Sequence, residues 1–240
     1  MTETTRTGAG LSGRRGQLVV SLPANEVELA KIALDAGADV VKVHLNLKHM
    51  SGHEFGTFAD NAAEFAKIIE LGAPVGLVPG AGEVFITKDE LDQALAMGFD
   101  FVNADMATAP SYFADPAVPF VPSGGGAPGS LGYLAGVSAL QDMPGDWMEA
   151  SGVNLEGHRK PLPYQDLLSL RETGRVSGRR LIVPSVRTLV PTDVPRLFDI
   201  PDVWAVMIGA YVTGTTAESL QAAVTAFRAA FDELGFRRAA

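Results

Sequence analysis

The chain has 240 residues, of which 47% are hydrophobic and 20% are charged, and its formal net charge is −9. This length is enough for one large domain with a sizeable core. The acidic balance argues against nucleic acid or an anionic membrane as a partner, because phosphate groups would be repelled. There are no cysteines, which excludes disulfides and thiolate metal sites.

The first 16 residues are polar and rich in Gly, Ser and Thr, so residues 1–16 are predicted to form a flexible tail before a folded region over 17–240. The sequence shows no apolar run of membrane-spanning length and no signal peptide. We therefore expect a cytoplasmic protein.

A pattern of helix, glycine and β-branched run recurs along the folded region. Gly37, Gly72 and Gly98 each follow a helical pattern and suit the left-handed position that closes a helix. Thr87 and Glu90 have the spacing of a capping box at the start of one such helix. The β-branched runs are typical of strands buried on both faces. Strands are predicted over residues 17–22, 39–45, 74–79, 99–105, 133–139, 146–151, 180–186 and 203–209.

Eight strands separated mostly by helices predict a single α/β domain, a (β/α)₈ TIM barrel. The alternative is a doubly wound open sheet, but no Gly-rich dinucleotide motif follows the first strand. The region after the fourth strand is long, and only five residues separate the fifth and sixth strands, so the fifth helix is predicted to be reduced. Residues 106–130 are a candidate lid or partner contact, in which Tyr112, Phe113 and Phe120 would pack over a ligand.

The active site of such a barrel lies at the carboxyl ends of the strands. Because side chains alternate along a strand, Lys42, His44 and Asn46 should share one face of the second strand. The other polar residues at predicted strand ends are Ser21, Asn103, Asp105, Glu149, Ser185 and Arg187.

Lys42 and Glu149 are the principal catalytic candidates, with His44 and Asp105 beside them. A buried lysine that loses its proton would act as a base or attack a carbonyl, and a buried carboxyl group would be a matching acid or base. The structural alternatives are a Lys42 that only pairs with Asp105 or Glu149, and a His44 that only fills the core.

Substrate binding is predicted for Ser21, Asn46 and Asn103, although a structural role for Asn103 is the alternative. The stretch "VMIGAYVTGTTAESL" places a glycine-containing turn between the last strand and a helix, an arrangement that suits an anion. Barrels commonly bind phosphate between the loops after strands seven and eight. The predicted phosphate-binding residues are Ser185, Arg187, Gly209, Ala210 and Gly214.

The chain resembles the phosphate-binding (β/α)₈ barrels, the superfamily of ribulose-phosphate epimerases, thiamine phosphate synthase and prenylglyceryl phosphate synthases. The segment "DVWAVMIGAYVTGTTAESLQAAVTAF" is similar to the closing segment of N-acetylmannosamine-6-phosphate epimerases. The segment "LVVSLPANEVELAKIALDAGADVVKVHLN" is similar to the start of (5-formylfuran-3-yl)methyl phosphate synthase, a lysine-dependent lyase. These resemblances imply a barrel that binds a phosphorylated ligand.

The residues favour an enzyme that acts on a small phosphorylated sugar or keto compound by Lys/Glu acid–base chemistry, as an isomerase or epimerase does. The alternatives are an aldolase-type lyase or synthase that forms a Schiff base on Lys42, a transferase of the prenylglyceryl phosphate type, and a non-catalytic barrel that binds a phosphorylated ligand. No resident cofactor or metal is predicted, although Mg²⁺ held by carboxylates remains an option. His49, His53 and Glu54 have a metal-like spacing only on a helix, and Gly52 favours a loop. A homo-oligomer is expected.

Overall fold

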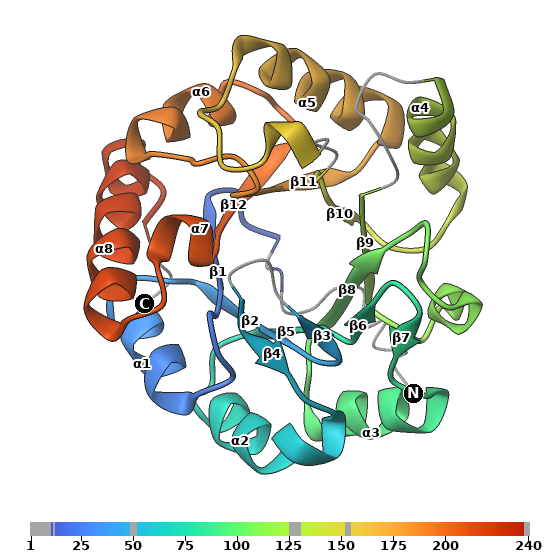
Figure 1. Ribbon diagram of the computed structural model, residues 1–240. Helices are drawn as coiled ribbons and strands as arrows, with labels where there is room; N and C mark the ends of the chain where they lie inside the picture. Colours follow the sequence, from blue (N-terminus) through green and yellow to red (C-terminus); the bar gives the residue numbers. More distant parts are fainter. Residues whose placement is uncertain (1–10, 12, 49–51, 125–130, 152–154, 238–240) are drawn as a thin grey trace, which may run out of the picture.

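The chain folds into a closed barrel of eight parallel strands surrounded by helices (Figure 1). The computed structural model describes residues 11, 13–48, 52–124, 131–151 and 155–237. Around the barrel the strands follow the order β1-β12-β11-β10-β9-β8-β5-β2, and β2 pairs with β1 to close it. The strands are β1 (Gln17–Ser21), β2 (Val40–His44), β5 (Val75–Val78), β8 (Phe101–Asp105), β9 (Phe120–Ser123), β10 (Trp147–Glu149), β11 (Arg180–Pro184) and β12 (Val203–Ile208).

Helices form the outer layer, and two short hairpins rise from the ends of strands β2 and β5. The helices are α1 (Val27–Asp35), α2 (Phe58–Glu70), α3 (Lys88–Met97), α4 (Leu131–Ser138), α5 (Tyr164–Ser177), α6 (Val194–Phe198), α7 (Ala210–Thr213) and α8 (Ala217–Glu233). The 3₁₀ helices are η1 (Ser111–Ala114), η2 (Ala139–Asp142), η3 (Leu155–Gly157) and η4 (Pro191–Asp193). One hairpin joins β3 (Leu47–Lys48) to β4 (Glu54–Phe55), and the other joins β6 (Gly80–Ala81) to β7 (Val84–Phe85).

The predicted (β/α)₈ barrel is confirmed, and so is much of its local chemistry. Gly37, Gly72 and Gly98 all have a positive φ. The capping box of α3 is present: the Thr87 N–H donates to Glu90 Oε2 at 2.8 Å, and the Glu90 N–H donates to Thr87 Oγ1 at 3.2 Å. Within the part of the chain that the structure describes, no helix is long and apolar enough to cross a membrane.

The fifth unit of the barrel differs from the prediction. Residues 133–139 were predicted as the fifth strand, but they lie in and just after helix α4. The fifth strand is instead β9, within the stretch predicted as a long loop, and its Val102–Asp105 partners on β8 extend the sheet in parallel register. The fifth helix is short, as predicted, with eight residues. The fourth unit has only the 3₁₀ helix η1 between β8 and β9.

The aromatic residues of the candidate lid pack into the protein. The Phe113 ring lies 6.1 Å from Phe85 and 5.4 Å from Phe120, and Phe113 is buried. The Tyr112 hydroxyl donates to the carbonyl oxygen of Ile86. These contacts fix η1 against the hairpin β6–β7, and none of the three aromatic residues lines the cavity described below.

The barrel has two hydrophobic layers because side chains alternate along each strand. The larger layer lies between the strands and the helices, and the smaller one fills the lower part of the barrel interior. On five of the eight strands the interior position next to the carboxyl end is polar instead. On the same face, Val19 is followed by Ser21, Val40 by Lys42, Phe101 by Asn103, Val121 by Ser123 and Trp147 by Glu149. This change from apolar to polar sets the floor of the functional site.

Gly76 on β5 leaves room for the Phe101 ring inside the barrel. A Cβ atom at residue 76 would lie 2.2 Å from Phe101 Cζ, and Phe101 is only 1% exposed. We expect Gly76→Ala to lower the free energy of unfolding by about 2 kcal/mol through overpacking, as measured by urea unfolding. The matched control is Gly136→Ala in α4, where no atom lies within 4 Å of the added Cβ, and it should stabilise the protein by about 0.5–1 kcal/mol. An unchanged stability of Gly76→Ala would contradict this packing.

Part of the predicted tail is bound to the floor of the barrel. Leu11 is 3% exposed and packs among the interior residues. The Arg15 guanidinium donates to the carbonyl oxygens of Phe198, Ile200 and Val203. These contacts hold the described part of residues 1–16 against the amino-terminal face of the barrel, where buried carbonyl groups need donors.

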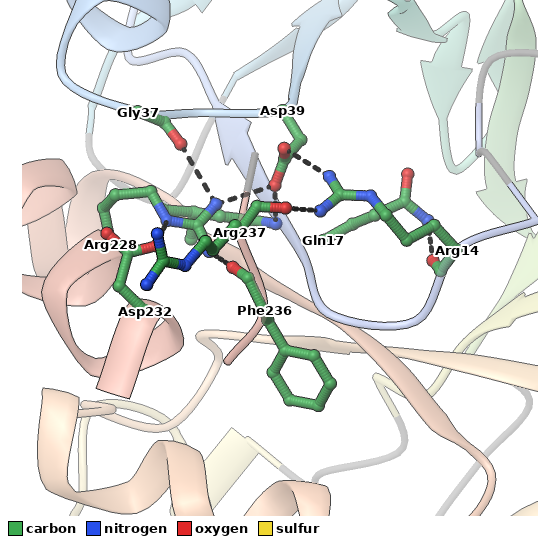
Figure 2. Close-up of polar contacts among 9 residues, drawn as sticks. Arg14, Gln17, Gly37, Asp39, Arg228, Asp232, Phe236 and Arg237 are labelled. Carbon is green, nitrogen blue, oxygen red and sulfur yellow. Dashed lines mark hydrogen bonds and ion pairs between the residues drawn. The ribbon is translucent and has the colours of Figure 1, made fainter. Parts of the chain in front are cut away.

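A buried carboxylate joins the beginning of the chain, β2 and the carboxyl-terminal helix (Figure 2). Asp39 accepts hydrogen bonds from Arg14 at 2.7 Å, from Arg228 at 3.0 Å and from the Leu18 N–H at 2.8 Å. Arg228 also donates to the carbonyl oxygen of Phe236 at 2.5 Å. The contacts stabilise the closure of the barrel at the face opposite the functional site.

Candidate functional site

A cavity of about 430 Å³ opens at the carboxyl ends of the strands. Its size falls within the range of small-molecule sites. Nine of the twelve residues predicted for the site line it: Ser21, Lys42, His44, Asn103, Asp105, Glu149, Ser185, Gly209 and Ala210.

Lys42 and Glu149 form a buried ion pair at the base of this cavity. Lys42 Nζ lies 2.9 Å from Glu149 Oε2, and the two residues are 5% and 8% exposed. Strands β2 and β10 are four places apart in the ring of eight, so the lysine side chain reaches across the barrel to meet the carboxylate. Two buried charges are tolerated only when paired and further hydrogen-bonded.

Asn103 supplies that further bond. Its Oδ1 accepts from Lys42 Nζ at 2.9 Å, and its Nδ2 donates to the carbonyl oxygen of Val121 at 2.9 Å. Because both ends of the amide are bound, Asn103 holds the ammonium group in one position. Lys42 is therefore paired with Glu149, as the structural alternative expected, and it also lines the cavity, as the catalytic interpretation expected.

The ion pair keeps one donor and one acceptor for a ligand. Lys42 uses two of its three N–H donors on Asn103 and Glu149, and no described residue accepts from the third. Glu149 Oε1 makes no hydrogen bond with any described residue. An ammonium donor and a carboxylate acceptor therefore lie side by side where they line the cavity.

His44 lies on the same face of β2, two residues beyond Lys42. Its Nε2 is 3.1 Å from Ser21 Oγ, and its ring packs 4.7 Å from the ring of Phe55 on the hairpin β3–β4. Asn25 fixes the backbone there, donating to the His44 carbonyl oxygen at 2.7 Å and accepting from the His44 N–H at 3.1 Å. The imidazole and the serine hydroxyl thus form a second polar pair on the cavity wall.

Asp105 is the outermost of these groups. It ends strand β8, it is exposed, and its Oδ1 accepts from the Ala107 N–H at 2.8 Å. A Cβ at residue 124 would lie 2.3 Å from Asp105 Oδ2, so Gly124 is needed for the carboxylate to sit there. Asp105 adds negative charge to the mouth of the cavity.

The wall between β11 and β12 offers two hydrogen-bond donors. Ser185 Oγ accepts from the Gly209 N–H at 2.9 Å, and the Ser185 hydroxyl proton has no acceptor among the described residues. The backbone N–H of Ala210 likewise has no acceptor in the described chain. Since both residues line the cavity, these donors suit an anionic group.

Three predicted site residues lie elsewhere. Asn46 has left the strand, with φ 52°, and its N–H donates to the Gly56 carbonyl oxygen at 3.0 Å. Arg187 is bound to both carboxylate oxygens of Asp166, at 2.6 and 3.2 Å, so its charge is neutralised outside the cavity. Gly214, with φ 65°, turns the chain between α7 and α8. None of the three lines the cavity.

The carboxylate and histidine groups form no ready metal site in the described part of the chain. No group of three or more His, Asp or Glu residues there is placed to hold a metal ion. Glu54 pairs with Lys48 at 3.0 Å in an exposed position, and the His53 ring packs against Phe55. His49 lies outside the described residues.

Several residues that line the cavity were not predicted from the sequence. Ser123 ends strand β9 beside Glu149, and it was missed because β9 was assigned to a loop. Its signal was the run "FVPS", a short apolar stretch that ends in a polar residue. Tyr211, next to Ala210, and the glycines of the hairpin β6–β7 also line the cavity.

No model of a known protein family matches the chain, and no curated protein sequence matches it. Several solved structures have a similar fold. A phosphoribosyl anthranilate isomerase from Thermus thermophilus is 13% identical with a TM-score of 0.64, and the match covers 91% of this chain and 99% of that chain. A tryptophan synthase from Mycobacterium tuberculosis is 12% identical with a TM-score of 0.66, over 90% and 93% of the two chains. The tryptophan synthase A-subunit from Pyrococcus furiosus is 16% identical with a TM-score of 0.63, over 89% and 98%. At these identities the similarity establishes the barrel fold alone.

Proposed function

We propose that the chain is an enzyme that moves a proton next to the carbonyl group of a small phosphorylated sugar or keto compound, as an isomerase or epimerase. The observation that carries this proposal is the Lys42–Glu149 pair: both residues line the cavity, and the pair leaves one N–H donor and one carboxylate oxygen without a partner among the described residues. The names of the structural neighbours, an isomerase of a phosphoribosyl compound among them, are consistent with it.

The proposed chemistry assigns one role to each group. Glu149 Oε1 takes the proton from the carbon next to the carbonyl, and the C–H electron pair forms the double bond of an enol. The Lys42 ammonium group donates a hydrogen bond to the carbonyl oxygen, where negative charge develops. His44, supported by Ser21, transfers a proton to or from the substrate oxygen. Return of the proton to the same face of the same carbon regenerates the substrate. A proton delivered by a second acid to the opposite face of that carbon gives the epimer, and return of the proton to the neighbouring carbon gives an isomer.

The phosphate is placed against Ser185 and Ala210. Their two donors lie on the β11–β12 wall, while the ion pair links β2 and β10. A phosphate bound there fixes the substrate so that its reacting end meets Lys42 and Glu149, which lowers the entropic part of the barrier.

A Schiff base on Lys42 is the second candidate mechanism, because the amine lines the cavity and Glu149 is an adjacent proton acceptor. An ammonium group cannot attack a carbonyl, so this mechanism requires Lys42 to transfer a proton to Glu149 first. Borohydride reduction in the presence of phosphorylated carbonyl compounds distinguishes the two: a mass increase located on Lys42 would establish the imine. Loss of activity in a chelator would instead favour a Mg²⁺-dependent transferase.

The test is proton exchange with solvent. Wild-type protein is incubated in deuterium oxide with a panel of phosphorylated ketoses, aldoses and amino sugars, and proton NMR follows the C–H signals next to the carbonyl. We expect one class of compounds to lose its C–H signal at a catalysed rate, and its unphosphorylated form to react far more slowly. Absence of catalysed exchange across the panel would contradict the proposal and favour a barrel that only binds its ligand.

A further inference from the structure

The wall of the cavity formed by β8 and β9 carries polar groups that the proposed chemistry does not use. Asp105 and Ser123 are partners in the parallel register of these two strands, and Ser123 is also the partner of Glu149 on β10. All three residues line the cavity. They form a continuous polar arc that runs from the ion pair to the exposed Asp105.

One acceptor and one hydroxyl group on this wall have no partner in the described part of the chain. Asp105 Oδ1 accepts from the Ala107 N–H at 2.8 Å, whereas Asp105 Oδ2 receives no hydrogen bond from a described residue. Ser123 is 8% exposed, and its hydroxyl group makes no hydrogen bond with a described residue. Gly124 leaves the space that Oδ2 occupies, because a Cβ at residue 124 would lie 2.3 Å from that atom. A carboxylate oxygen and a hydroxyl group therefore remain for a ligand.

The chemistry of these two groups limits what the wall can bind. No lysine, arginine or histidine of the described chain pairs with Asp105, so a second carboxylate on the ligand would be repelled. A methyl group would leave both polar groups without a partner. A hydroxyl group satisfies both, since it donates to Asp105 Oδ2 and accepts from the Ser123 hydroxyl group. An ammonium group has no lone pair to accept the Ser123 proton.

The wall lies across the cavity from the proposed phosphate position. Strand β8 is four places from β12 in the ring of eight, so Asp105 faces the strand that leads to Ala210. The Lys42–Glu149 pair crosses the barrel between these two walls, from β2 to β10. A ligand with its phosphate against Ala210 thus places its other end at Asp105 and its central carbon atoms near the ion pair.

We propose that Asp105 and Ser123 are specificity-determining residues, which bind a hydroxyl group at the end of the substrate remote from its phosphate. The substrate is then a hydroxyketone or hydroxyaldehyde phosphate, and phosphorylated keto acids are rejected by the charge of Asp105. The inference rests on the proposed function and names the substrate class of the same site.

Three small phosphorylated ketones that differ only in the group remote from the phosphate are the probes. Dihydroxyacetone phosphate carries a hydroxymethyl group there, hydroxyacetone phosphate a methyl group, and phosphohydroxypyruvate a carboxylate. NMR titration measures the dissociation constant of each. We expect the wild type to bind dihydroxyacetone phosphate about 10-fold more tightly than either of the other two.

Asp105→Asn is the most informative variant, because its amide keeps an oxygen for the Ala107 N–H and places an NH₂ group where Oδ2 was. We expect it to lose the preference for the hydroxymethyl compound and to bind phosphohydroxypyruvate about 5-fold more tightly than the wild type does, a gain that misfolding cannot produce. Ser123→Ala should weaken the binding of dihydroxyacetone phosphate alone, by about 3-fold. The matched control is Asp115→Asn: Asp115 is exposed outside the cavity, its Oδ1 likewise accepts from the N–H two residues further on, and the variant should bind all three probes as the wild type does.

Equal binding of the three probes by the wild type would overturn the inference, and so would the wild-type preference in both Asp105→Asn and Ser123→Ala. Catalysed proton exchange of a phosphorylated compound by the same protein would show that the proposed function stands in either case. If the wild type binds none of the three probes, the inference falls together with the phosphate position of the proposed function.

Discussion

Glu149→Gln is expected to slow solvent proton exchange of the substrate by about 10³-fold, because a carboxamide cannot accept the proton from carbon. The substitution keeps the size of the side chain, and its amide oxygen still accepts a hydrogen bond from Lys42, which lies 2.9 Å from Glu149 Oε2. The loss should therefore appear in kcat, with little change in KM. The measurement is the exchange rate by NMR under saturating substrate.

Lys42→Met should produce a loss of about 10²–10³-fold by removing the donor to the carbonyl oxygen. Since the two residues act on one step, the double variant should be hardly slower than the worse single variant. The control is Asp92→Asn, a carboxylate exposed on α3 and paired with Lys88. Full exchange activity of a folded Glu149→Gln would remove Glu149 from the mechanism.

Asp39→Asn is expected to lower the free energy of unfolding by about 3 kcal/mol, the largest loss of stability that we predict. The Asp39 side chain is 7% exposed and receives three hydrogen bonds, two of them from arginines (Figure 2). Removal of its charge leaves the Arg228 guanidinium, itself 9% exposed, without its buried counter-ion. Arg14 is more exposed, at 32%, and water replaces part of its loss.

Urea unfolding measures this effect. Asp199→Asn is the matched control, because its pair with Arg196 is exposed on both sides and should contribute less than about 0.5 kcal/mol. Proton exchange should persist in Asp39→Asn at temperatures where the variant is folded, since Asp39 precedes β2 at the face opposite the cavity. A change of stability as small as that of the control would contradict the role given to Asp39.

Local patterns in the sequence were sufficient for seven of the eight strands. A helix that ends on a left-handed glycine and leads into a β-branched run is a signal contained within about twenty residues. The fifth strand gave no such signal, because Pro122 cannot donate to a sheet and normally argues against a strand interior. Its pairing explains the exception: β9 pairs with β8 over four residue pairs but with β10 only at Glu149–Ser123.

The candidate site was predictable to the extent that strand alternation determines it. Lys42 and His44 share a face of β2, and Asn103 and Asp105 share a face of β8, as the period of two requires. The position of the Arg187 side chain could not be predicted from the sequence, because its partner Asp166 lies on α5 and only the fold brings the two residues together.

A crystal structure with phosphoglycolohydroxamate, a phosphorylated mimic of an enediolate, would test the central claim most directly. We expect the hydroxamate oxygens to lie within hydrogen-bond distance of Lys42 Nζ and Glu149, with the phosphate against Ser185 Oγ and the Ala210 N–H. A ligand bound outside the cavity, or bound in it with both ends away from Lys42 and Glu149, would contradict the account.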